Sequence, residues 1–158
     1  MTGVVFVDAN LLVLLIVGSA SKDYIARHKR LQEFTMDDFD LLNVLIAQFS
    51  DLVVLPHVLA EASNLARQIS GRARADVQHA LRSLIESVTE LPIPSILGSR
   101  RPEFTQLGLT DSVILHLCSM SIDDISPTLI TADSNLADAA NSMGYSVIDY
   151  RREYLDAP

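Results

Sequence analysis

Residues 3–18 have the sequence GVVFVDANLLVLLIVG, the most apolar stretch of the chain, and its one charged side chain is Asp8. The run Val4–Val7 consists of β-branched and aromatic residues, which is typical of a strand buried on both faces. Leu11–Val17 continues as a helix, so Asp8 falls at the junction of the two elements. Burial of an unpaired charge is strongly unfavourable. The position of Asp8 therefore predicts a partner that compensates its charge.

Further strand and helix signals alternate along the rest of the chain. Apolar runs predict strands over Asp51–Leu55, Pro127–Thr131 and Tyr145–Tyr150. Apolar residues at helical spacing predict the other helices over residues 22–34, 35–49, 56–69, 72–89, 110–117 and 134–144. A capping box at Thr35–Asp38 starts the second of these, Pro56 starts the third, Gly71 ends it, and Thr110 is the N-cap of the fifth. Residues 91–99 form a turn-rich segment with room for one short edge strand.

This alternation predicts the fold class. Apolar strands separated by amphipathic helices indicate an α/β fold, a three-layer α/β/α sandwich around a central, mostly parallel sheet of four to five strands. The length of 158 residues and the 49% hydrophobic content are typical of one domain, which we expect to span residues 1–158. In such sheets, ligands bind beyond the carboxyl ends of the strands.

Composition bounds the compartment and the partners. Cys118 is the single cysteine and lies in an apolar stretch, so we expect a buried thiol and a reducing compartment. The first residues lack the basic region of a secretion signal, and no run reaches the ~18 apolar residues that a membrane span needs. We therefore expect a cytoplasmic protein with no membrane contact. The net charge of −8 disfavours broad adhesion to nucleic acid but allows a local basic rim.

Four acidic residues flank the predicted strands: Asp8, Glu61, Asp111 and Asp133. Each has a simpler explanation when taken alone, since aspartate caps helices and Glu61 would share a solvated helix face with His57, Asn64 and Gln68. Together they suggest convergence at one sheet edge, where two carboxylates about 4 Å apart would repel by roughly 4 kcal/mol. A hard cation such as Mg²⁺ or Mn²⁺ relieves that repulsion and prefers oxygen ligands. Asp8 is therefore predicted to be a metal ligand, and the chemistry to be phosphodiester hydrolysis.

Four short motifs in this order resemble the PIN domain over nearly the whole chain. They are Val7–Asn10, Leu59–Asn64, Leu109–Ser112 and Leu129–Ala137. The resemblance implies a Mg²⁺- or Mn²⁺-dependent endoribonuclease, with Asp8, Glu61, Asp111 and Asp133 as catalytic and metal-binding residues, and Thr131 and Asn64 as supporting residues. Asn10, two residues after Asp8, could support the site by orienting a carboxylate or a water, or could simply start the helix. It also implies the toxin of a type II toxin–antitoxin pair, a VapC-like protein with an antitoxin partner. The chain departs from many members at Asn135, where they carry a further aspartate, and in its longer helices between Lys22 and Ser50.

Partner surfaces remain open to two interpretations. Arg67, Arg72 and Arg74 follow the Glu61 helix most closely and are the preferred RNA contacts, although basic groups are usually only solvated. A homodimer is expected from the resemblance, through the apolar helices around Phe39–Phe49 or Val113–Leu117, and both segments could equally belong to the core.

Three other classes of protein compete with the nuclease. A haloacid-dehalogenase-type phosphatase needs an aspartate where this chain has Asn10, and a lysine late in the chain, whereas no lysine follows Lys29. A phospho-receiver domain is disfavoured by the same missing lysine. A PIN-like module that binds RNA or protein without cutting stays open as the alternative.

Overall fold

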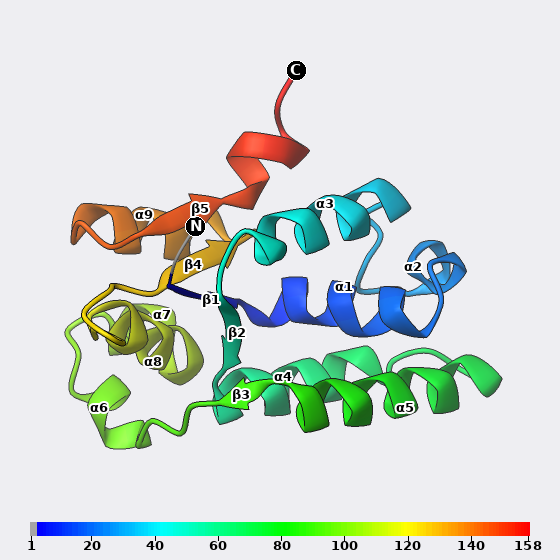
Figure 1. Ribbon diagram of the computed structural model, residues 1–158, viewed down its shortest axis with the longest axis horizontal. Helices are drawn as coiled ribbons and strands as arrows, with labels where there is room; N and C mark the ends of the chain where they lie inside the picture. Colours follow the sequence, from blue (N-terminus) through cyan, green and yellow to red (C-terminus); the bar gives the residue numbers. More distant parts are fainter. Residues whose placement is uncertain (1–2) are drawn as a thin grey trace.

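The protein is described here by a computed structural model, which covers residues 3–158 (Figure 1). Five strands form one sheet in the order β3-β2-β1-β4-β5, and every neighbouring pair is parallel. The helices that connect the strands make the molecule a three-layer α/β/α sandwich, which confirms the predicted fold class. The strands are β1 (Val4–Val7), β2 (Asp51–Val54), β3 (Thr89–Glu90), β4 (Thr128–Thr131) and β5 (Val147–Asp149).

The strand order reverses direction beside β1. From β1 the chain adds β2 and then β3 on one side, and it later returns to add β4 and β5 on the other side. Val5–Val7 pair with Thr128–Ile130, so the carboxyl ends of β1 and β4 lie next to each other. Such a switch point opens a crevice for ligands at the carboxyl edge of a parallel sheet.

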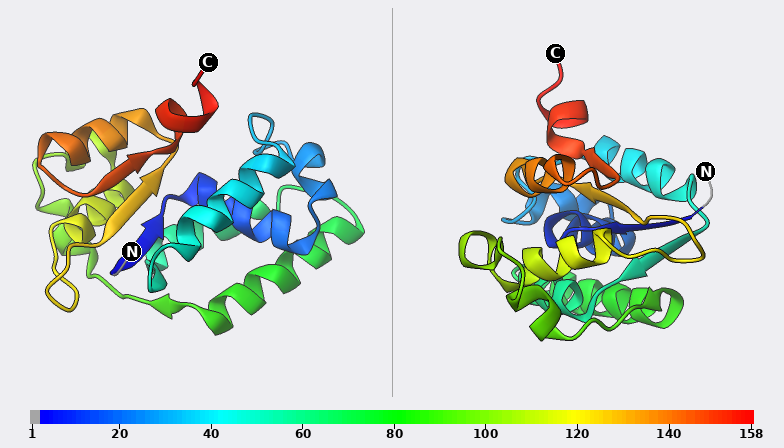
Figure 2. Two further views of the ribbon diagram at one scale, coloured as in Figure 1. Left: turned by 45° about the horizontal axis from the view of Figure 1, so that its top comes forward. Right: turned by 90° about the vertical axis from the view of Figure 1, so that its left-hand side faces the viewer.

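Helices cover the sheet and fill the space around its central strands, as the two views of Figure 2 show. Helix α1 (Ala9–Ala20) is buried almost all round, because it contacts four other helices, α2 to α5. Gly18 allows α3 to approach α1, since a Cβ atom there would overlap the ring of Phe39. The other helices are α2 (Asp23–Arg27), α3 (Met36–Ala47), α4 (Pro56–Ala66), α5 (Arg72–Ser87), α6 (Ser95–Ser99), α7 (Phe104–Leu107), α8 (Leu109–Cys118), α9 (Ser134–Ser142) and a π-helical turn, η1 (Arg151–Leu155).

Several predicted boundaries were wrong. The helix predicted over residues 22–34 is only the five-residue α2, and residues 28–35 form a loop that the buried His28 fastens to α4. The short edge strand β3 precedes the turn-rich segment, which instead holds α6. Gly71, expected to end α4, stands as the N-cap of α5. Neither α7 nor η1 was predicted.

Other local predictions are confirmed. The capping box at the start of α3 is present, with Thr35 and Asp38 bonded reciprocally to each other's backbone. Cys118 is buried, and burial raises the pKa of its thiol to about 12. Among residues 3–158, no helix combines the length and the apolarity needed to cross a bilayer.

One of the two apolar segments considered for a dimer interface belongs to the core. The apolar side chains of Val113–Leu117 are buried, so α8 offers no apolar outer face there. Helix α3 does expose Met36 and Val44.

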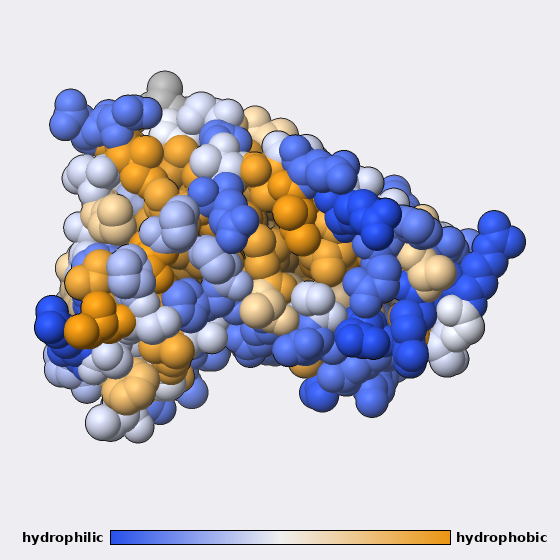
Figure 3. Space-filling view, turned by 90° about the horizontal axis from the view of Figure 1, so that it is seen from below, coloured by the Kyte–Doolittle hydropathy of each residue, from blue (hydrophilic) through white to orange (hydrophobic). Residues whose placement is uncertain are grey.

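Seen from below, apolar residues gather in the middle of the molecule, and hydrophilic residues cover the end where α4 turns into α5 (Figure 3).

Candidate functional site

A small cavity lies at the carboxyl edge of the sheet, where the strand order reverses. Its volume is about 120 Å³, and acidic side chains dominate its lining. They come from four separate segments: the end of β1, the middle of α4, the first turn of α8 and the end of β4. We call this cavity the carboxylate pocket, and its polar lining residues are Asp8, Asn10, Glu61, Thr110, Asp111 and Asp133.

Asp8 is the most firmly held of these acids. It is buried and caps α1, with Oδ1 accepting a hydrogen bond from the Leu11 amide at 3.1 Å. Its Oδ2 atom accepts from the Thr131 hydroxyl and from the Ala132 amide, the latter at 3.1 Å. Burial raises the pKa of Asp8; the hydrogen bonds from Thr131, Leu11 and Ala132 oppose this, and the charge of Asp133 adds to it. The opening stretch of sequence therefore buries its one acid with three donors around it.

Asp133 fulfils a capping role and lines the carboxylate pocket as well. Its Oδ1 atom accepts from the amides of Asn135 at 2.9 Å and Leu136 at 3.2 Å, which caps α9. Thr131 links the two strand ends, because its hydroxyl donates to Asp8 and accepts from the Asp133 amide at 3.0 Å. Capping and a place in the pocket are thus compatible, and Thr131 binds the carboxylate of Asp8 and the backbone of Asp133.

Asp111 occupies a different position from the one predicted. Helix α8 starts one residue before Thr110, and its N-cap is Gly108 with φ of 87°, so neither Thr110 nor Asp111 caps it. The pKa of Asp111 is raised from 3.8 to about 7, first by burial and then by the charges of Asp133, Asp8 and Glu61. Three acids from other segments thus repel the charge on Asp111.

Glu61 and Asn10 form the rim of the carboxylate pocket. Both side chains are exposed, and neither makes a side-chain hydrogen bond within residues 3–158. Exposure was the simpler explanation for Glu61, and the structure shows that Glu61 is exposed and also borders the pocket.

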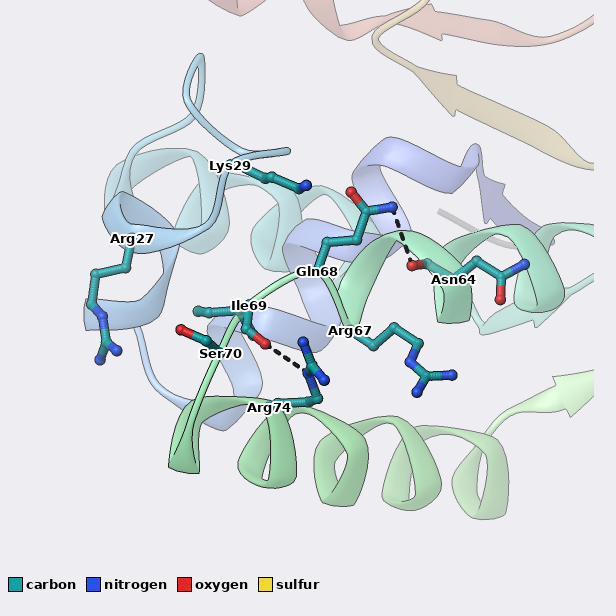
Figure 4. A pocket seen from close by; sticks show the side chains of 8 residues that line it. All are labelled: Arg27, Lys29, Asn64, Arg67, Gln68, Ile69, Ser70 and Arg74. Carbon is teal, nitrogen blue, oxygen red and sulfur yellow. Dashed lines mark hydrogen bonds between the residues drawn. The ribbon is translucent and has the colours of Figure 1, made fainter.

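The remaining predicted site residues lie elsewhere. Asn64, Arg67 and Arg74 line a second cavity of about 670 Å³ between α2, α4 and α5, together with Arg27, Lys29 and Gln68 (Figure 4). We call it the basic pocket. Arg72 lies beside this cavity in sequence but does not line it. Asn64, which we expected beside the carboxylates, thus lines the basic pocket instead.

Two residues that support the carboxylate pocket, Ala132 and Arg151, were not predicted from the sequence. The amide of Ala132 donates to Asp8, and its carbonyl accepts from Nε of Arg151 at 2.9 Å. Arg151 also binds both carboxylate oxygens of Glu33, at 2.9 and 2.8 Å. Backbone donors carry no side-chain signature, and Arg151 follows the last strand, where no motif marks it. Arg151 thus binds the residue whose amide donates to Asp8.

The carboxylate pocket offers the ligand atoms that a hard cation prefers, but its acidic side chains are too far apart for three of them to bind a cation directly. All its acidic groups offer oxygen atoms, which Mg²⁺ and Mn²⁺ prefer. Within residues 3–158, however, no three His, Cys, Asp or Glu side chains are close enough together to hold a metal ion directly.

The comparisons with known proteins add no relative to this description. No family model matches the chain, and no curated protein matches it.

Proposed function

We propose that the protein is a Mg²⁺- or Mn²⁺-dependent endoribonuclease that hydrolyses phosphodiester bonds of RNA at the carboxylate pocket. One observation carries this proposal: four carboxylates from distant parts of the chain line a cavity of about 120 Å³. Carboxylates so placed repel one another, and the raised pKa of Asp111 reports that repulsion together with burial. A bound cation would relieve it, and the resemblance to the PIN domain gives the same four residues that role.

The free lone pairs in the pocket suit such a cation. Oδ1 of Asp8 accepts a single hydrogen bond and keeps one lone pair, and Asp133 uses only Oδ1 for capping. Mg²⁺ is usually bound through one or two carboxylates and retains several waters. Asp8, Glu61, Asp111 and Asp133 would hold it, some through water, so a cage of three direct ligands is not required. When bound, the cation would supply an activated water and stabilise negative charge on the phosphate.

The residues of the carboxylate pocket would have different roles in the reaction. Asp8 provides a fixed carboxylate, since three donors and the surrounding core restrict it. Asp111, with its pKa raised to about 7, can hold a proton near neutral pH while no cation is bound, and it would release that proton on binding. Asn10 and Glu61 on the rim are our candidates for orienting the phosphate.

The narrower assignment depends on the resemblance alone. We propose a toxin of a type II toxin–antitoxin pair that acts in the cytoplasm, has an antitoxin partner and forms a homodimer. Growth arrest on expression, relieved by Asp8→Asn, would be the expected behaviour of such a toxin.

The test is cleavage of a panel of single-stranded and structured RNAs with Mn²⁺, with Mg²⁺ or with chelator. We expect cutting only with metal. Asp8→Asn and Glu61→Gln should each lower the rate by at least about 100-fold, because each removes a charged group needed in the transition state. Glu61 is exposed, so Glu61→Gln tests the site even if Asp8→Asn folds poorly.

Asp37→Asn is the matched control, because it removes one exposed carboxylate from α3 and should leave the rate unchanged. Cutting that persists equally in Asp8→Asn and Glu61→Gln would refute the proposed site. Binding of RNA without cutting by any variant would favour the alternative, a PIN-like RNA- or protein-binding module without nuclease activity. The absence of three acids at direct ligating distance within residues 3–158 is the observation that favours this alternative.

A further inference from the structure

Unpaired cations concentrate at one place in this acidic protein. Of its 12 lysines and arginines, only Lys22, Arg101, Arg151 and Arg152 form ion pairs within the described part of the chain. Four of the other eight line the basic pocket: Arg27, Lys29, Arg67 and Arg74. No acidic residue lines it, although the chain carries a net charge of −8. Within residues 3–158, the basic pocket thus gathers half of the cations that form no ion pair.

Buried and bonded side chains build this pocket from three segments. His28 is fully buried, and its Nδ1 accepts from the Arg30 amide at 3.1 Å, so its Nε2 must be the donor to the Ala66 carbonyl at 2.8 Å. This ties the loop that carries Lys29 to the end of α4. Nε of Arg74 donates to the Ile69 carbonyl at 2.8 Å, which fixes that guanidinium across the turn between α4 and α5.

The cationic groups keep most of their donors free. Figure 4 shows the guanidinium groups of Arg67 and Arg74 in the space between α4 and α5, with Lys29 extending from the loop toward Gln68. Arg67 and Lys29 make no side-chain hydrogen bond or ion pair within residues 3–158. The guanidinium of Arg27 lies 5.1 Å from the ring centre of Tyr24, which restricts it at the opposite rim. Such guanidinium groups suit bidentate contact with phosphate oxygens.

Helix α4 connects the two pockets. Glu61 borders the carboxylate pocket and Asn64 borders the basic pocket, three residues apart and so on the same face of the helix. Arg67 lies about 9 Å beyond Glu61 along the helix axis, at about 1.5 Å per residue. One nucleic-acid strand can span that distance within a few nucleotides. A free mononucleotide is too short to occupy both pockets at once, so the arrangement favours a strand.

We infer that the basic pocket binds a phosphodiester of the RNA strand, a few nucleotides from the bond that lies at the carboxylate pocket. This inference rests on the proposed nuclease function. The pocket contacts backbone phosphate and carries no sequence code, so it positions the strand and leaves selection of the cut sequence to other contacts.

The test measures binding of a labelled single-stranded RNA by fluorescence anisotropy in chelator, where no cutting occurs. Lys29→Gln and Arg67→Gln should each weaken binding several-fold, and the double variant about tenfold, equally for RNAs of different sequence. The slope of log K against log salt should fall by about 0.7 for each lost contact. Arg82→Gln is the matched control, because it removes one unpaired charge from α5, eight residues beyond Arg74 and outside the basic pocket.

Three results would overturn the inference. The first is RNA binding that Arg82→Gln weakens as much as Arg67→Gln does. The second is full occupation of the pocket by millimolar inorganic phosphate without any effect on RNA binding, which would assign it to a free anion. The third is displacement of RNA by polyglutamate at an equal charge concentration, which would assign the pocket to an acidic protein segment.

Failure of this inference and failure of the nuclease proposal are distinguishable. Metal-dependent cutting that is unchanged in the double variant would overturn the basic pocket and leave the nuclease standing. Pocket-dependent RNA binding without cutting by wild type under any metal would overturn the nuclease and support only the phosphate contact.

Discussion

The two pockets are built on different principles. The carboxylate pocket is small and lies where the sheet fixes the backbone, so that Asp8 and Asp133 follow directly from the ends of β1 and β4. The basic pocket is several times larger and is assembled from a loop, a turn and two helix ends. The first brings like charges together within a rigid frame, where the proposed cation would relieve their repulsion. The second leaves positive charges without acidic partners on the surface, where the proposed RNA phosphate would bind.

The largest expected difference between the two pockets is in the stabilisation of the fold by a metal ion. At a Mn²⁺ concentration about 100 times its Kd, linkage would stabilise wild type by about 2.7 kcal/mol, seen as a rise in Tm. Asp8→Asn should lose most of that rise, because it removes the most firmly held ligand. Lys29→Gln/Arg67→Gln should retain all of it. An equal rise in wild type and in Asp8→Asn would separate the carboxylate pocket from metal binding.

The pH dependence of stability without metal should be the next largest effect. The folded-state pKa of Asp111 is about 7, above its ordinary 3.8, so folding favours the protonated form. Its stabilising contribution is present below pH 3.8 and is lost as the pH rises through 7. A rise of the pKa from 3.8 to about 7 corresponds to about 4 kcal/mol, and solvent screening at this partly exposed side chain reduces the expected effect to about 2 kcal/mol.

Urea unfolding of wild type and Asp111→Asn in chelator measures this effect. The free energy of unfolding of the variant should exceed that of wild type by about 2 kcal/mol at pH 8, and the two should converge toward pH 4.5. A difference that stays constant with pH would show that neither burial nor the neighbouring carboxylates raise the pKa of Asp111.

The same contrast explains what the sequence could predict. Asp8 was predictable as a buried strand-end acid because its neighbours on both sides are core residues, and Asp133 because it follows another apolar run. Parallel strands then bring such ends to one edge without further information. The motif around Asp111 was found, but its helix begins after Gly108, which adopts a positive φ of 87° and has no capping side chain.

The basic pocket could not be predicted in the same way. Lys29 and Arg67 are 38 residues apart, and what brings them together is the buried His28, which carries no signal of that role in the sequence. The periodicity of residues 22–34 even predicted a helix there. Arg151 likewise acts through a backbone carbonyl, which no pattern of side chains can indicate.

Removal of the Thr131 hydroxyl tests the rigidity of the carboxylate pocket. Thr131→Val should lower the free energy of unfolding by about 2 kcal/mol, because it deprives a buried carboxylate of one donor and the Asp133 amide of its acceptor. Thr128→Val in the same strand is the control, since that hydroxyl bonds Ser146 at an exposed position and should cost at most about 0.5 kcal/mol. Equal losses in chemical unfolding would mean that Thr131 does not support Asp8.

Replacement of His28 is the corresponding test of the basic pocket, and its effect should be the smallest. His28→Leu places a side chain of similar size in the same buried position but removes both ring hydrogen bonds. We therefore expect the free energy of unfolding in urea to fall by about 1 kcal/mol. Freed from α4, the loop would no longer hold Lys29 at the basic pocket, and RNA affinity should fall about threefold with the metal-induced rise in Tm unchanged. His79→Leu, at an exposed position of α5, should alter neither quantity. A variant that lost metal response together with RNA affinity would show that the two pockets form one coupled unit, because loosening a loop remote from the sheet edge would then have disturbed the carboxylates.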